Sequence, residues 1–444
     1  MRKLLVMLLS AFLTGACSLE DGNSVGGPDN CSNRGQKEFV LFAMQEWYLW
    51  NDLLPDNVNT RDFGSPEELL AFLTTFSPDD GAGQPIDVFS FIGSAAADAA
   101  FFGEGQFEGF GFSYRQVADG DVRLSRVFSD SPANAAGLER GQRILELDGR
   151  TVADIQAAEG LSAAFDTTPL SFTMRETNGD EFTVSIDKDI VTIDPIPQSR
   201  IIDAGGGRSV GYLELATFIS TANPEFDTVF AEFNANGVND VIIDLRYNSG
   251  GLVSTANLLG DYFGGDIAEN LTFSRTEFNA DRAADNNYSV FFERLANSVS
   301  LSRLIVIATQ GTASASELVT NGMGPHVEVV IVGDRTFGKP VGQVGFEFCE
   351  KILRPTAFKT VNADGFGDYF GGLPVTPGCD APDDLNIPVG DATDPNMVAA
   401  LGYLETGACP VIAAPGGLQK PAFALPAARP DLRGPPWREF AGAY

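Results

Sequence analysis

Residues 311–343 read GTASASELVTNGMGPHVEVVIVGDRTFGKPVGQ, and the rest of the chain is organised around this stretch. It combines a turn of small residues, a short helical segment, an apolar strand and a lysine that follows glycine. Ser314 in such a turn can present its hydroxyl at a helix N-terminus, where free N–H groups stabilise developing negative charge. A serine needs a base to become a nucleophile. The only histidine is His326, but a lysine serves when burial lowers its pKa.

The stretch resembles the serine/lysine dyad of the C-terminal processing peptidases, also called tail-specific proteases. Members of that family carry the nucleophile at the first serine of Ser-Ala-Ser-Glu, and the base in Thr-Phe-Gly-Lys with a glutamine four residues later. The matching positions are Ser314, Lys339 and Gln343, which would orient the lysine. Ser316 is the competing nucleophile and ranks second. Pro340 departs from the family pattern, where glycine is common, and removes a backbone N–H beside the base.

A second run, DLRYNSGG, ends an apolar segment whose pattern predicts a strand buried on both faces. Paired glycines at a strand-to-helix turn let backbone N–H groups approach a ligand closely. The resemblance implies an oxyanion hole with one N–H from Gly250 or Gly251 and another from Ala315. The sequence does not choose between the two glycines. Arg246 and Asn248 are expected to shape the turn rather than to do chemistry.

Residues 107–188 resemble a PDZ domain. The run SPANAAGL predicts a short helix that its proline begins and its glycine ends. The resemblance implies a loop that offers N–H groups to the C-terminal carboxylate of a peptide, which then adds as a strand to the sheet edge. The loop departs slightly from the usual pattern, and its residues are Gly109, Phe110, Gly111 and Phe112.

The fold class predicted is a multidomain α/β protein: a small N-terminal helical region, a PDZ-like β-rich domain and an α/β peptidase core of βαβ units. The family resemblance implies a ClpP- or crotonase-like core. Residues 190–208 have the composition of a linker. The expected boundaries are a signal segment at 1–17, a tether at 18–34, the helical region at 35–105, the PDZ domain at 106–190, the core at 195–410 and a Pro/Ala-rich, poorly ordered tail at 411–444.

The N-terminus has the features of a targeting segment, since a basic start precedes an apolar stretch too short to span a bilayer. The run LTGAC resembles a bacterial lipobox, which would make Cys17 the lipidated first residue of the mature chain. An ordinary secretory signal is the alternative. Four further cysteines predict two disulfides in an exported protein, with three pairings open. They are Cys31, Cys349, Cys379 and Cys409.

The formal net charge of −31 argues against nucleic-acid binding, which requires a basic face. The sequence therefore indicates a lipid-anchored serine endopeptidase of the bacterial cell envelope, facing the periplasm or held at the outer membrane. Its partner would be a polypeptide substrate, and no cofactor or metal is implied because backbone N–H groups hold the oxyanion. The alternative is a catalytically silent, peptide-binding envelope lipoprotein. The sequence does not predict the oligomeric state.

Overall fold

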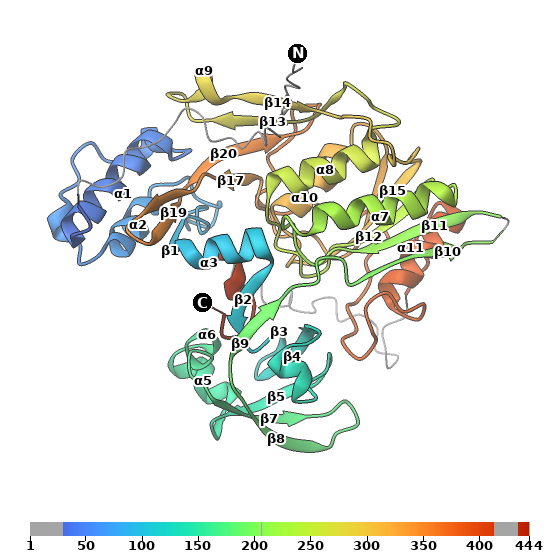
Figure 1. The fold of residues 1–444 in the computed structure, drawn as a ribbon, viewed down its shortest axis with the longest axis horizontal. Coiled ribbons are helices and arrows are strands. Elements are labelled where there is room, and N and C mark those ends of the chain that lie inside the picture. Colours follow the sequence, from blue (N-terminus) through green and yellow to red (C-terminus); the bar gives the residue numbers. More distant parts are fainter. Residues whose placement is uncertain (1–29, 206, 413–433, 444) are drawn as a thin grey trace, which may run out of the picture.

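The structure is a computed structural model that describes residues 30–205, 207–412 and 434–443 (Figure 1). Its centre is a five-stranded sheet in the order β10-β11-β12-β15-β16. β10 pairs antiparallel with β11, and the remaining neighbours are parallel. The predicted core of alternating strands and helices is therefore present. The strands span Gln198–Asp203 (β10), Ser209–Glu214 (β11), Asp240–Asp244 (β12), Arg303–Ala308 (β15) and Glu328–Gly333 (β16).

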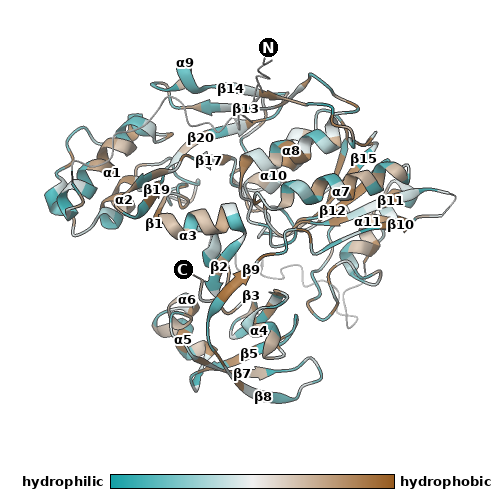
Figure 2. Cartoon of the chain, viewed as in Figure 1, coloured by the Kyte–Doolittle hydropathy of each residue, from teal (hydrophilic) through white to brown (hydrophobic). Residues whose placement is uncertain are grey.

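Helices cover both faces of this sheet because its central strands are buried on each side. Three helices pack on one face and α11 packs on the other, each against its own apolar cluster. In Figure 2, α7 and α8 carry both hydrophilic and hydrophobic segments, as expected of helices that lie on a sheet. The four helices are α7 (Ala222–Ala235), α8 (Val253–Gly264), α10 (Ala315–Met323) and α11 (Pro395–Thr406).

Two smaller sheets flank the core. One has the order β14-β13-β20-β17, and the other has the order β1-β19-β18 with the N-terminal helices packed against it. Trp47 and Tyr48 are buried there and form part of that core. The elements are α1 (Asn33–Trp47), α2 (Pro66–Thr74), β1 (Phe91–Ser94), α3 (Ala95–Ala99), β13 (Thr272–Phe278), α9 (Ala283–Asn286), β14 (Tyr288–Phe291), β17 (Val341–Gln343), β18 (Phe346–Phe348), β19 (Lys351–Arg354) and β20 (Thr356–Val361), with single turns η1 (Asn51–Leu53), η2 (Thr60–Asp62) and η3 (Ala100–Glu104).

A β-rich lobe lies below the core in Figure 1 and is reached through the paired strands β2 and β9. Its sheet has the order β3-β4-β5-β7-β8, so β3 is an edge strand. The predicted short helix is present and is capped by Ser131, whose hydroxyl accepts from Asn134 N–H at 3.2 Å. The elements are β2 (Gln106–Gly109), β3 (Phe112–Ala118), β4 (Asp121–Val127), α4 (Pro132–Ala135), β5 (Arg143–Leu147), β6 (Arg150–Thr151), α5 (Val152–Ala158), α6 (Leu161–Ala164), β7 (Leu170–Arg175), β8 (Glu181–Ile186) and β9 (Asp189–Thr192).

Two expectations were wrong. Residues 190–208 are not a linker, since they form most of β9 and all of β10. Pro195 and Pro197 lie in the connection between these two strands. The tail is also not uniformly without structure, because residues 434–443 contain η4 (Pro436–Glu439) and a buried segment against the β-rich lobe. Composition misled in this case because two aromatic residues, Trp437 and Phe440, provide the burial.

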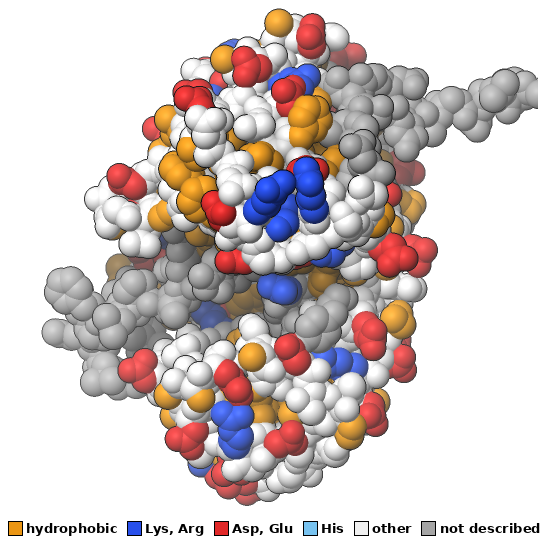
Figure 3. Space-filling view, turned by 90° about the vertical axis from the view of Figure 1, so that its left-hand side faces the viewer, with side chains coloured by type: hydrophobic (Ala, Val, Ile, Leu, Met, Phe, Trp, Pro, Cys, Tyr) orange, Lys and Arg blue, Asp and Glu red, His pale blue; other side chains and the backbone are white. Residues whose placement is uncertain are grey.

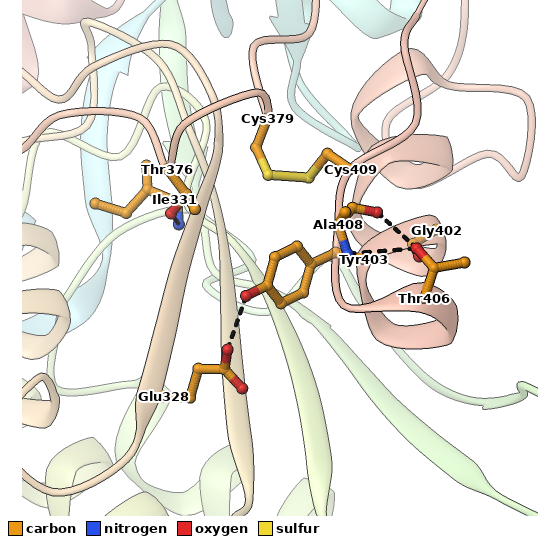
Figure 4. Close-up of a disulfide and its surroundings, with 9 residues drawn as sticks. All are labelled: Glu328, Ile331, Thr376, Cys379, Gly402, Tyr403, Thr406, Ala408 and Cys409. Carbon is orange, nitrogen blue, oxygen red and sulfur yellow. Dashed lines mark hydrogen bonds between the residues drawn. A yellow bond between two sulfur atoms is a disulfide. The ribbon is translucent and has the colours of Figure 1, made fainter.

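The four cysteines form two disulfides, Cys31–Cys349 and Cys379–Cys409, which settles the pairing that the sequence left open. The first joins the start of α1 to the turn between β18 and β19. The second joins the segment between β20 and α11, which lies beside the end of β16, to the residues just after α11 (Figure 4). On the same side, the Tyr403 hydroxyl of α11 donates to Glu328 of β16 at 2.7 Å. Covalent and polar contacts therefore both fix α11 to its sheet.

Acidic side chains are spread over both lobes of the face drawn in Figure 3, where Lys and Arg form only small groups. Among the described residues, none of the helices has the length and apolar character that a bilayer crossing requires. Within the same ranges, no three His, Cys, Asp or Glu side chains come together as metal ligands would. The predicted lipidation site, Cys17, lies outside the described residues.

Candidate active site

Ser314 occupies the turn between β15 and α10 with φ 54° and ψ −114°, a region that residues other than glycine rarely adopt. Such a conformation costs on the order of 1–3 kcal/mol and persists only where the surroundings impose it. Here the turn is fastened to the end of β12. Thr312 donates its hydroxyl to Leu245 O at 2.7 Å, and Ala313 N–H donates to Asn248 O at 3.0 Å. The strained serine is therefore held at the N-terminus of α10.

Glu317, in the first turn of α10, connects the serine to the lysine segment. Its carboxylate is fully buried and accepts from Ser314 N–H at 2.9 Å and from Lys339 N–H at 2.7 Å, both on Oε2. Its Oε1 accepts from Gly338 N–H at 2.7 Å and from the Thr336 hydroxyl. Burial raises the pKa of Glu317, and these four donors oppose that shift. One carboxylate thus fixes the backbone of both candidate residues.

Lys339 has the environment that a lysine base requires. Burial lowers the pKa of Lys339 to about 8, against the opposing charges of Asp87 and Glu317. The ammonium group lies 5.1 Å from the centre of the Phe89 ring, which gives it a cation–π contact. About one tenth of this lysine is therefore neutral at pH 7, far more than for an exposed lysine.

Gln343 in β17 holds the lysine side chain in place. Lys339 Nζ donates to Gln343 Oε1 at 3.1 Å. The amide of Gln343 donates in turn to Phe89 O at 2.6 Å and to Arg354 O at 3.2 Å, which fixes its orientation. Pro340, the departure from the family pattern, keeps a ladder contact because its carbonyl accepts from Thr360 N–H at 2.9 Å.

The side chains of Ser314 and Lys339 are not hydrogen-bonded to each other in the part of the chain that the structure describes. The two residues are brought together through Glu317 rather than by direct contact of their functional atoms. Catalytic hydrogen bonds are often long in structures without substrate and tighten in the complex. The arrangement is therefore a site whose backbone is fixed and whose hydroxyl and amine are not hydrogen-bonded to each other.

The glycine turn after β12 lies directly against the serine. A Cβ on Gly250 would lie 2.7 Å from Ser314 Cβ and 2.9 Å from Ala315 N, so only glycine fits. The N–H of Gly250 donates to Asn248 Oδ1 at 2.9 Å. By contrast, neither Gly251 N–H nor Ala315 N–H donates a hydrogen bond within the described ranges. This favours Gly251 over Gly250 as the partner of Ala315.

The residues expected to shape that turn do so. The guanidinium of Arg246 is fully buried and pairs with Asp244 and Asp394, each at 2.6 Å. Asn248 donates its amide to Leu215 O at 2.8 Å while accepting from Gly250. The turn is therefore anchored to two neighbouring strands and to the start of α11.

Two other candidates are accounted for by structural contacts. The hydroxyl of Ser316 is buried and donates to Asn248 O at 3.0 Å, so it is engaged away from the turn's open side. His326 Nε2 contacts Thr272 O at 2.9 Å, and its ring packs edge-on against Phe292. Neither contacts Lys339.

Sequence reasoning missed three contributors to the site. Asp87 and Phe89 come from the loop before β1, far from the lysine in sequence, and no local pattern marks them. Glu317 lies inside the Ser-Ala-Ser-Glu run, but its role could not be inferred. A glutamate three residues after a helix cap indicates a capping contact, not a bridge to a second segment.

The loop of residues 109–112 lies at the start of the edge strand β3. Gly111 has φ 87°, and a Cβ there would lie 2.1 Å from Ser131 Cβ, so glycine is required. The rings of Phe110 and Phe112 are fully buried in the core of the lobe. Phe110 N–H and Phe112 O face outward from the sheet edge and are bonded to Ala441.

The structure thus joins an α/β core to a turn with a strained serine near a lysine of lowered pKa, and comparison with known proteins gives the family. The chain belongs to peptidase family S41, whose members are serine-type peptidases. The sequence profile of peptidase family S41 matches residues 209–373, and that of the peptidase S41 N-terminal domain matches residues 35–91.

Individual proteins and a solved structure of this family are also similar to the chain. A carboxyl-terminal-processing protease of Picosynechococcus sp. (strain PCC 7002) is 27% identical over 55% of this chain and 57% of its own length. The carboxy-terminal processing protease CtpA of Bacillus subtilis is 23% identical over 64% and 59%. The chain thus spans little more than half the length of these relatives. The fold is similar to that of a putative S41 protease from Bacteroides fragilis, with TM-score 0.64 and 24% identity over 83% of this chain and 97% of that one.

Proposed function

We propose that the protein is a serine endopeptidase of the C-terminal processing type, with Ser314 as nucleophile and Lys339 as general base. The observation that carries the proposal is the shared attachment of the two residues to Glu317, which holds a strained serine beside a buried lysine. The substrate class is polypeptide, which follows from the family and from the names of the curated relatives.

The reaction follows from these positions. Neutral Lys339 accepts the proton of the Ser314 hydroxyl as the oxygen attacks the scissile carbonyl. The N–H groups of Ala315 and Gly251 donate to the oxyanion of the tetrahedral intermediate. The C–N bond then breaks, Lys339 returns the proton to the departing amine, and an acyl-enzyme remains. Water attacks the acyl group with Lys339 again as base, which releases the carboxylic acid and regenerates the serine.

Gln343 has a positioning role in this scheme. A lysine side chain has four rotatable bonds, so a fixed acceptor reduces the orientations that its amine samples. Gln343 Oε1 accepts from Nζ, and the glutamine is itself held by two backbone carbonyls. The lone pair of the neutral amine is thereby left to face another partner.

The β-rich lobe is proposed to be a PDZ domain that captures substrate peptide at the edge of β3. Support comes from the glycine-requiring loop 109–112 and from the position of β3 at the edge of its sheet. We keep the domain boundaries predicted from the sequence, but residues 190–208, predicted to be a linker, contribute to β9 and β10. Lipidation of Cys17 and a place in the bacterial cell envelope remain proposals that rest on the targeting pattern.

The test is digestion of casein by the purified chain without its signal segment, beside the variants Ser314→Ala and Ser316→Ala. We expect cleavage by the parent, loss below detection for Ser314→Ala, and retained cleavage for Ser316→Ala, because only the second hydroxyl is already engaged. A serine-directed fluorophosphonate should label the parent and not Ser314→Ala. Absence of both labelling and cleavage in a folded parent would favour the alternative, a peptide-binding protein without catalytic activity.

A further inference from the structure

The edge of β3 is occupied by the chain's own C-terminal segment, residues 434–443. Ala441 N–H donates to Phe112 O at 2.9 Å, and Phe110 N–H donates to Ala441 O at 3.3 Å. Phe440 forms an antiparallel bridge with Ser113. Backbone hydrogen bonds of this kind are how an added peptide strand binds a sheet edge. The contacts use the loop that the sequence marks for peptide binding.

Side chains of the segment fill an apolar pocket beside that edge. The ring of Phe440 stacks on Phe107 with centroids 4.6 Å apart and meets Phe128 edge-on at 5.0 Å. Trp437 lies 5.7 Å from Phe101 and 6.3 Å from Phe91 in β1. Both aromatic side chains are almost completely buried. The contacts reach from the β-rich lobe to the sheet beside the N-terminal helices.

The segment also carries a buried acidic side chain, Glu439. Burial raises the pKa of Glu439 to about 8, and the neighbouring Ser249 and Arg126 act in the opposite direction. Ser249 directly precedes Gly250 and Gly251 in the glycine turn after β12. Arg126 in β4 pairs with Glu214 at the end of β11 at 2.9 Å. The backbone contacts of the segment are therefore made at the β3 edge, and Glu439 lies buried between the two lobes near Arg126 and Ser249.

We propose that residues 437–443 are the resident ligand of the β3 edge, so that a substrate peptide must displace the chain's own C-terminal segment before it binds. The proposal rests on the proposed peptide-capture function. The ligand class that it defines is an extended peptide with an aromatic side chain for the pocket of Phe107 and Phe128, followed by small residues as in Phe440-Ala441-Gly442-Ala443. Gly442 is required there, because a Cβ would lie 2.8 Å from the Phe110 ring.

Because residues 434–443 are covalently attached to the chain, they should compete strongly with a free peptide for the β3 edge. A segment joined to its own site has an effective concentration of about a millimolar, well above that of a free peptide. An external peptide of the same sequence should therefore bind the intact chain at least about tenfold more weakly than a chain from which the segment is removed. Catalytic turnover is not needed to measure this difference.

The experiment uses the Ser314→Ala background, so that peptide is not consumed. A fluorescein-labelled peptide of residues 434–444 is titrated into the full chain and into a chain that ends at residue 433, and binding is followed by anisotropy. We expect saturable binding to the shortened chain and at least tenfold weaker binding to the full chain. A peptide with Phe440→Glu should lose at least tenfold in affinity. A peptide with Arg438→Ala should not, because Arg438 is exposed. Equal affinity of the two chains would overturn the proposal, as would a shortened chain that melts cooperatively and binds no peptide.

A second measurement covers the case in which the shortened chain fails to fold. Hydrogen exchange on the full chain should show protection of Ala441 N–H, and excess unlabelled peptide should speed its exchange at least severalfold by displacing the segment. Exchange that is unaffected by saturating peptide would mean a permanent structural strap and would overturn the proposal. In the chain that retains Ser314, removal of the segment should raise casein cleavage severalfold. If neither chain cleaves casein, the proposed function fails while the two binding measurements still decide this one.

Discussion

The turn between β15 and α10, which carries Ser314, and the edge of β3 meet their backbone hydrogen-bonding requirements in opposite ways. At the turn, the buried carboxylate of Glu317 holds Ser314 and Lys339, and the N–H groups of Gly251 and Ala315 have no acceptor among the described residues. At the β3 edge, the open positions are filled by Ala441 from a distant part of the same chain. A reaction centre requires fixed geometry with open donors, whereas a capture site tolerates a replaceable strand.

The largest effect that would break this comparison concerns the base. Lys339→Met removes the amine but keeps an apolar side chain of similar length, so we expect kcat/KM on a peptide substrate to fall at least about 10³-fold. Thermal stability should hold or rise, because a buried amine loses hydration. Lys359→Ala is the matched control, since its amine is an exposed partner of Glu277 at 3.0 Å. A Lys339→Met variant within tenfold of the parent would exclude Lys339 as base.

The next effect concerns the carboxylate that joins the two halves of the site. Glu317→Ala leaves four donors, two buried and two part-buried, without their acceptor, and we expect a loss of unfolding free energy of roughly 3 kcal/mol. Activity should fall with it, because the strained turn loses its anchor. Denaturant unfolding gives the free energy. Glu67→Ala removes a carboxylate from an exposed pair with Lys351 and should change stability by less than about 1 kcal/mol. Equal stability losses in the two variants would contradict the role given to Glu317.

The pH dependence sharpens the assignment of the base. With a Lys339 pKa of about 8, the neutral fraction is roughly one tenth at pH 7 and nine tenths at pH 9. We therefore expect kcat/KM to rise about ninefold over this interval and then to level. Asp87→Asn should shift this rise in kcat/KM to lower pH, since the charge of Asp87 raises the pKa of Lys339. If the rise in kcat/KM occurs at the same pH in the Asp87→Asn variant, a group other than Lys339 controls it.

The smallest effect tests the link between the two regions. Arg140 of the β-rich lobe donates to the Tyr247 hydroxyl at 2.9 Å and pairs with Asp383 at 3.0 Å, next to the oxyanion turn. Arg140→Ala should lower kcat/KM severalfold while leaving the lobe folded, because the turn loses one of its supports. Arg175→Ala in the same lobe removes only an exposed pair with Glu181 and should have no measurable effect. Steady-state kinetics on one peptide compares them, and equal values would show that the lobe does not act through Arg140.

Much of the fold followed from local pattern. The strand β12 was predicted from its apolar run and is buried at every position. Ser65 and Asp394 cap α2 and α11, since a side-chain oxygen before a helix satisfies its free N–H groups, which is a local signal of the helix start. The error at residues 190–208 has a physical cause, since strand pairing overrides a composition rich in proline and glycine. The tail was misjudged because burial of Trp437 and Phe440 depends on partners far away in sequence.

The sequence by itself determined the candidate chemistry: the Ser314 and Lys339 pair, the glutamine, the glycine turn and the family to which they belong. Such motifs are local, because a tight turn and a helix start need fixed residue types at fixed spacing. Tertiary structure alone decided which disulfides form, that Asp87 and Phe89 surround the lysine, and that Glu317 joins two segments. It alone also placed the C-terminal segment on the β3 edge. Each of these depends on contacts between residues distant in sequence, which only the packing of the folded chain specifies.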